Sequence, residues 1–215
     1  LPLTPDLPRR LMNVRKALAL AAALTMGGAG LAWCSSSSNN DGQPLPTTQA
    51  PTGELSKVLA SHGLADLEAT EIVDTLDATP LAKRPTDLLS SLRPREIVLT
   101  SAYGSETTQP LPKDKFYLSF APYIDQTHDC YFHSLTTCTA ELSNKDFDVT
   151  IVDSDTGEKL VDDTLTSFDN GFVGVWLPKG IDAELTVTYD GKSASTGIST
   201  VADDDATCLT TLQLS

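Results

Sequence analysis

The sequence predicts an α+β fold, in which a small helical N-terminal unit is followed by an antiparallel β-sandwich-like C-terminal domain. Three observations favour this class. Apolar residues recur at helical spacing after residue 54, they alternate with polar residues from residue 96 onward, and turn signals interrupt the second half at regular intervals.

Residues 1–33 have the layout of a secretory signal peptide. Four basic side chains between Arg9 and Lys16 precede an apolar run, residues 17–24, that is too short to remain in a bilayer as a spanning helix. The sequence Leu31-Ala32-Trp33-Cys34 then resembles a bacterial lipobox, with Trp33 where that motif has a small residue. We therefore expect an extracytoplasmic protein anchored to the outer face of the cell membrane by a lipid on Cys34. Ordinary signal cleavage and secretion is the alternative.

The charge of the remaining chain argues against one class of partner. Without residues 1–33 the chain has 11 basic and 28 acidic side chains, a net charge of −17. Binding to nucleic acid needs a basic footprint, so we expect no nucleic-acid partner. A surface of this charge suits a soluble domain outside the cell.

Residues 34–53 form the predicted lipidated, flexible tether, because they are rich in Ser, Pro, Thr and Gly and have no apolar period. Residues 54–110 are assigned to the helical N-terminal domain and its connection. Two helices are predicted by apolar residues at helical spacing, and a third, shorter helix is predicted over residues 85–92, ended by Pro94. The first helix is defined by Leu55, Val58 and Leu59, and the second, after Gly63, by Leu64, Leu67, Ile72, Val73 and Leu76. About forty residues bury little surface alone, so we expect this unit to pack on the second domain or on a copy of itself.

Residues 111–215 form the predicted β-rich domain, which we expect to hold any metal site. Phe116, Leu118 and Phe120 alternate with less apolar residues, and the run 172–177 is apolar on both faces, which predicts a central strand. Asn170-Gly171 is a strong hairpin signal. Further turns are predicted at residues 153–157 and 190–191, and a last strand at residues 207–214 places Cys208 on the same face as Leu212 and Leu214.

The chemistry of the chain is concentrated in residues 128–138, which contain His128, Cys130, His133 and Cys138. Thiolate and imidazole ligands suit Cu(I), Zn(II) and iron–sulfur centres, whereas carboxylates suit Mg(II) and Ca(II). Two or three thiolates with an imidazole favour Cu(I), and a four-ligand zinc site is chemically reasonable as well. Cys208 can join this site only if the final strand lies alongside the loop that contains the other ligands.

The cysteines are also consistent with a protein that binds no metal. The three thiols of Cys130, Cys138 and Cys208 cannot all pair within one chain. One disulfide with a buried bystander is the plain structural alternative, and Cys130 with Cys138 could close a small loop. No methionine follows residue 26, so thioether-based copper carriage is excluded and the thiols must bind any copper.

Three segments resemble the CueP family of bacterial envelope copper-binding proteins: residues 115–123, residues 130–138 and residues 207–212. The resemblance implies copper binding through Cys130, Cys138 and Cys208, with help from His133 and more weakly from His128. It also implies a helical N-terminal domain associated with homodimerisation and a β-rich C-terminal domain that contains the site.

The leading functional hypothesis is an envelope copper-binding protein that sequesters copper, reduces it or delivers it to a copper-accepting envelope enzyme. Such a protein is a carrier more than an enzyme, although its thiols could reduce Cu(II) or Fe(III) stoichiometrically. A thiol–disulfide or metal-reducing redox protein is the second hypothesis, because a thiolate near histidine can have a lowered pKa. A β-sandwich surface lipoprotein without metal is the third.

Overall fold

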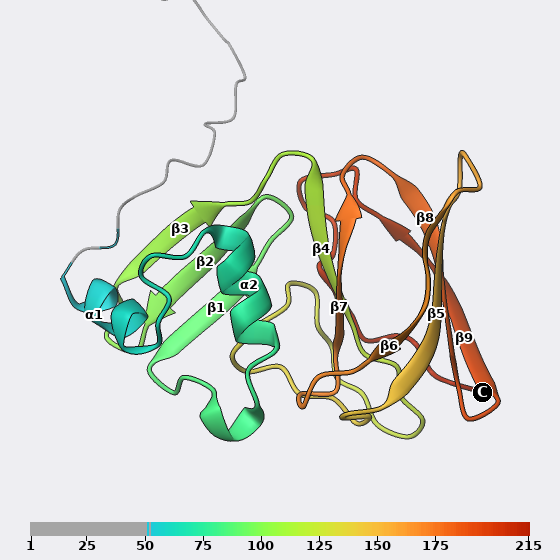
Figure 1. Ribbon diagram of the computed structural model, residues 1–215, viewed down its shortest axis with the longest axis horizontal. Coiled ribbons are helices and arrows are strands. Elements are labelled where there is room, and N and C mark those ends of the chain that lie inside the picture. Colours follow the sequence, from blue (N-terminus) through green and yellow to red (C-terminus); the bar gives the residue numbers. More distant parts are fainter. Residues whose placement is uncertain (1–50, 52) are drawn as a thin grey trace, which may run out of the picture. The chain divides into compact units, whose positions relative to one another are not determined.

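The structure is a computed structural model that describes residue 51 and residues 53–215 (Figure 1). The predicted signal peptide and nearly all of the predicted tether, including Cys34, lie outside the described residues. Within the described part, two α-helices precede ten strands arranged in three sheets, which confirms the α+β class. None of the helices described there is both long enough and apolar enough to cross a membrane.

The two predicted N-terminal helices are confirmed, but the second begins only at Ala69, so Leu64 and Leu67 lie in the connection before it. The helices are α1 (Glu54–Ser61) and α2 (Ala69–Asp77), and Gly63 ends the first of them with a backbone φ of +69° that glycine adopts without strain. Both pack on an antiparallel sheet of order β1-β2-β3, with β1 at Leu88–Leu92, β2 at Glu96–Ser101 and β3 at Glu106–Pro110. The core between them contains apolar residues of both helices and of the sheet, among them Leu59, Ile72, Leu88, Leu92 and Leu99.

The predicted third helix over residues 85–92 is wrong. A short 3₁₀ turn, η1 (Leu81–Lys83), is followed by strand β1, which buries Leu88 and Leu92 and leaves Leu89 54% exposed. The leucine pattern fits either period in so short a segment. Pairing with β2 along the full length of β1 decides for the strand.

The second half contains two sheets that face each other. One has the order β10-β4-β7 and the other the order β6-β5-β8-β9. All neighbours are antiparallel except β10 and β4, which run parallel. The strands of the first sheet are β4 (Lys115–Phe120), β7 (Val173–Pro178) and β10 (Cys208–Leu209), and those of the second are β5 (Asp146–Asp153), β6 (Lys159–Thr166), β8 (Asp182–Tyr189) and β9 (Lys192–Ser199). Phenylalanine, valine and leucine side chains from both sheets form one core.

Both faces of strand β4 are buried. Phe116, Leu118 and Phe120 enter the core between the two facing sheets, as their alternation predicted. Tyr117 points the other way, into the core that the helices form with the sheet β1-β2-β3. Trp176 of β7 packs against the helical core in the same way. The sheet β10-β4-β7 is therefore covered on both faces, and the helical part and the sandwich share it.

Two predictions about the run after residue 170 are corrected by this arrangement. Strand β7 is an edge strand of its sheet, not a central strand, and it is apolar on both faces because both faces are covered. The Asn170-Gly171 turn is not a hairpin between paired strands, because it joins β6 to β7, which belong to different sheets. Gly171 has a φ of +83°, and a Cβ there would lie 2.6 Å from the carbonyl oxygen of Ala140, so the turn needs glycine to lie against the loop after Cys138.

Candidate metal centre

The long connection between β4 and β5 carries Cys130, His133 and Cys138, and β10 lies beside it. The backbone N–H groups of Thr207 and Cys208 both donate to the carbonyl oxygen of Tyr131, at 3.0 Å each. The final strand therefore does lie alongside the loop, as the metal hypothesis requires. Cys208 is 2% exposed and packs with Ala121 and Phe172, whereas Leu212 and Leu214 enter the core between the two facing sheets. The predicted strand over residues 207–214 is shortened to Cys208–Leu209, and the predicted shared face of Cys208 with the two leucines is wrong.

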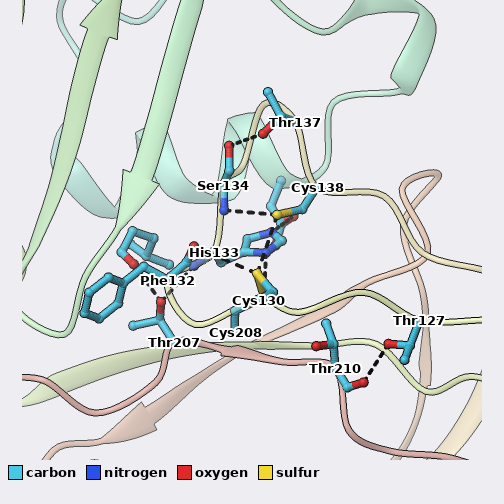
Figure 2. Close-up of a disulfide and its surroundings, with 12 residues drawn as sticks. Thr127, Cys130, Phe132, His133, Ser134, Thr137, Cys138, Thr207, Cys208 and Thr210 are labelled. Carbon is cyan, nitrogen blue, oxygen red and sulfur yellow. Dashed lines mark hydrogen bonds and ion pairs between the residues drawn. A yellow bond between two sulfur atoms is a disulfide. The ribbon is translucent and has the colours of Figure 1, made fainter.

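Four side chains converge at this point: Cys130, His133, Cys138 and Cys208 (Figure 2). Their potential ligand atoms all lie within 4.8 Å of one another. Three sulfur atoms that surround one metal ion at about 2.3 Å each lie about 4 Å apart. The Sγ atoms of Cys130 and Cys138 are 3.6 Å apart, and Cys208 Sγ is 3.6 Å from Nδ1 of His133, so the donors are already close to the spacing of a coordination sphere.

The structure joins Cys130 to Cys208 by a disulfide, with their Cα atoms 5.6 Å apart. The smaller loop considered from the sequence, Cys130 with Cys138, is therefore not the pair that forms. Cys138 keeps a free, half-buried thiol next to the disulfide. Three sulfur atoms are thus held together in the oxidised chain, and only one of them is a thiol.

The surroundings of Cys138 favour its thiolate. Burial raises the pKa of this thiol, but hydrogen bonding and the charge of His133, the backbone N–H of Ser134 and the charge of Arg84 together bring the pKa below its ordinary value. The Ser134 N–H donates to Cys138 Sγ at 3.4 Å, and the Arg84 guanidinium donates to the carbonyl oxygen of Cys138 at 2.6 Å. A thiol of this kind is both a nucleophile and a ready metal ligand.

His133 is completely buried and lies between the sulfur atoms and a buried carboxylate, Asp77. Burial alone lowers the pKa of this imidazole, but the hydrogen bonds and charges of Asp77 and Cys138 outweigh it and raise the pKa to about 9. Burial raises the pKa of Asp77, but hydrogen bonds from His133, Tyr117 and Asn170 and the charge of His133 outweigh it and lower the pKa. These shifts all favour the charged forms of Asp77, His133 and Cys138, whose charges alternate in sign.

Sequence reasoning missed the residues that contact the candidate ligands, above all Asp77 beside His133 and Arg84 beside Cys138. Asp77 did carry a signal, since it follows Val73 by four positions and so falls on the apolar face of the predicted helix. An acid on that face has to find partners inside the protein. Arg84 stands in a segment without regular spacing, and nothing in the sequence marks it.

His128 lies outside the group of four donors. Its side chain is exposed, its ring centroid is 6.1 Å from that of Phe172, and it lines an open cavity of about 540 Å³ together with Cys138 and Glu141. The structure thus places His128 at the solvent side of Cys138, and its predicted part as a ligand stays a prediction.

Comparison with known proteins gives a family for this arrangement. The family described as periplasmic copper-binding protein CueP matches residues 71–213, more than half of the chain and all four converging residues. The crystal structure of S.CueP is 45% identical in sequence, with a TM-score of 0.70, and the similarity covers 76% of this chain and 99% of that one. A comparison with curated proteins found no match. The chain therefore belongs to the CueP family of periplasmic copper-binding proteins.

Proposed function

We propose that this chain is an extracytoplasmic copper-binding protein that holds one Cu(I) ion through the thiolates of Cys130, Cys138 and Cys208 and the imidazole of His133. The observation that carries the proposal is the approach of these four donors to within 4.8 Å of one another. Soft sulfur ligands favour Cu(I), and a site of three sulfurs and one nitrogen also suits Zn(II), so zinc is the competing ion.

Copper binding by all three sulfurs requires the reduced chain, because the sulfurs of a disulfide are not thiolates. Oxidation of the Cys130 and Cys208 thiols to the disulfide releases two electrons and two protons, which is enough to reduce two Cu(II) ions to Cu(I). The close approach of these sulfurs supports such a stoichiometric reduction. Repeated turnover needs an external thiol or protein reductant that restores the dithiol.

Three further parts of the proposal extend beyond this centre. A lipid on Cys34 would anchor the chain to the outer face of the membrane, the N-terminal helical unit would form a homodimer, and an envelope enzyme would accept the copper. With these three parts, the protein would act in copper resistance, as a carrier that sequesters the copper ion and transfers it to the enzyme.

Titration of the fully reduced chain with Cu(I) against a competing chelator tests the proposal. We expect about one tightly bound ion per chain, and much weaker binding by the oxidised chain, which offers a single thiol at the site. Replacement of the three cysteines by serine should abolish tight binding, while the control His62→Gln, remote in sequence and paired with Asp87, should leave it unchanged. A loss of less than tenfold in the triple variant would refute the thiolate site.

The redox alternative is favoured by one observation, the free thiol of Cys138 at 3.6 Å from a disulfide sulfur. A catalyst would oxidise or reduce a substrate over many turnovers when a thiol donor is supplied, and thiol counting would show its disulfide cycling. Reduction that stops after one equivalent of disulfide per chain identifies a stoichiometric carrier instead.

A further inference from the structure

We infer that Asp77 is the positioning residue of the metal centre: it holds His133 through Nε2, so that Nδ1 is the ring atom presented to the metal. This inference rests on the proposed function and adds the atom that coordinates and the residue that selects it. It is carried by the hydrogen bonds around one buried carboxylate.

The two ring nitrogens of His133 face different partners. Nε2 lies 3.3 Å from Oδ1 of Asp77, and Nδ1 lies 3.6 Å from Sγ of Cys208. An ionised carboxylate only accepts hydrogen bonds, so the nitrogen that faces Asp77 must carry a hydrogen. The lone pair that can bind a metal is then on Nδ1, on the side of the sulfur atoms.

The backbone of His133 is fixed on both sides, which leaves only the side-chain torsions to be set. Its N–H donates to the hydroxyl oxygen of Thr207 at 3.1 Å, and its carbonyl oxygen accepts from the N–H of Leu92 at 2.8 Å. The ring packs on Phe172 with the ring centroids 4.6 Å apart. Asp77 is the partner that fixes which ring nitrogen faces the sulfur atoms.

Asp77 occupies a position that is unfavourable for a carboxylate unless its partners compensate. It is fully buried, and it is the last residue of α2, where the helix dipole disfavours negative charge. Removing a charge from water is unfavourable unless hydrogen bonds replace its hydration. Here the Tyr117 hydroxyl donates at 2.8 Å and the Asn170 amide at 3.0 Å, in addition to His133.

The surrounding backbone makes room for this network. A Cβ on Gly174 would lie 1.8 Å from the hydroxyl oxygen of Tyr117 and 2.9 Å from Oδ2 of Asp77, so β7 has no side chain at the one place where they meet. Donors from β4, from the turn before β7 and from the loop of His133 thus converge on one carboxylate. Groups that orient a metal-binding histidine typically contribute 10–100-fold to metal affinity.

Long-range ¹H–¹⁵N spectra of the reduced full chain labelled with ¹⁵N-histidine test the inference without any substitution. We expect Nε2 of His133 to carry a proton both with and without Cu(I), and Nδ1 alone to change its shift when Cu(I) is added. A metal-bound Nε2 with a protonated Nδ1 would overturn the inference, as would unchanged His133 nitrogens in a chain that binds copper. Failure to bind copper at all, seen separately in the chelator titration, would overturn the proposed function together with it.

A double-mutant cycle tests the role of Asp77 itself. We expect Asp77→Asn to weaken Cu(I) binding by about 10–100-fold. The matched control is Asp74→Asn, an exposed acid on the same helix whose carboxylate accepts from the indole of Trp176 at 2.8 Å, and it should change the affinity by less than about threefold.

In a His133→Gln background, Asp77→Asn should cause almost no further loss, because it acts through the imidazole. An equal loss in both backgrounds would show that Asp77 supports only the fold, and would overturn the inference. Near-UV circular dichroism of each variant confirms that the chain is folded before its affinity is compared.

Discussion

Gly174→Ala should disrupt the hydrogen bond between Tyr117 and Asp77, which lies beside the candidate metal centre. The added methyl group would lie 1.8 Å from the hydroxyl oxygen of Tyr117, 2.5 Å from its Cζ and 2.9 Å from Oδ2 of Asp77, so the tyrosine must move. Overpacking a core costs about 1–3 kcal/mol. A buried acceptor left without its donor costs about 1–3 kcal/mol more. The expected loss in the free energy of unfolding is therefore about 4 kcal/mol.

Urea unfolding of the oxidised chain measures this loss, with Gly197→Ala as the matched control. Gly197 also lies in a strand, β9, but nothing stands within 4 Å of its added methyl group. The control should be as stable as the parent or more stable by up to about 1 kcal/mol, because alanine restricts the unfolded chain. If the two variants differ by less than about 1 kcal/mol, the contact between Gly174, Tyr117 and Asp77 is not tight and the reasoning fails.

Three further predictions concern the sulfur atoms and His133. Reduction of the Cys130–Cys208 disulfide should lower the free energy of unfolding by about 4.5 kcal/mol, because the disulfide links residues separated by 78 positions. Urea unfolding should give the same loss in Cys138→Ser. A loss below about 1 kcal/mol would contradict this prediction. Alkylation of Cys138 by iodoacetamide at pH 7 should be slower in His133→Gln, because the imidazolium lowers the thiol pKa, and equal rates would show that it does not. The pKa of His133 is raised to about 9, so its stabilisation is complete below its ordinary value of about 6.5 and is lost as pH rises through 9. The stability advantage over His133→Gln should shrink across that range, and a constant advantage would argue against the ion pairs of His133 with Asp77 and Cys138.

Much of the fold could be predicted because the periodic patterns are long. The helices around Leu59 and Val73 and the alternation of Phe116 to Phe120 follow from residue spacing. The segment 85–92 could not be assigned in this way, because its leucines fit a short helix as well as a strand and only the pairing with β2 decides. The boundary between residues 110 and 111 stays a prediction.

The sequence marks the candidate ligands that the fold brings together, but not the residues that support them. Thiol and imidazole groups are rare enough to stand out, whereas Asp77 is one of 29 acidic residues in the chain. Its partners come from β4, from the Asn170-Gly171 turn and from the loop of His133, so only the tertiary fold brings them together. The pairing of Cys130 with Cys208 depends on the same packing, since sequence distance alone favours Cys138.

The double-sided burial of β4 links the proposed copper site to hydrophobic residues of the core between the two facing sheets. Phe116 and Leu118 flank Tyr117 along one extended backbone, so repacking the sandwich interior shifts the tyrosine that braces Asp77. Laboratory evolution for altered copper affinity should therefore select substitutions inside the sandwich as well as around the sulfur atoms. A protein engineer could use those remote positions to adjust affinity in small steps while keeping every donor in place.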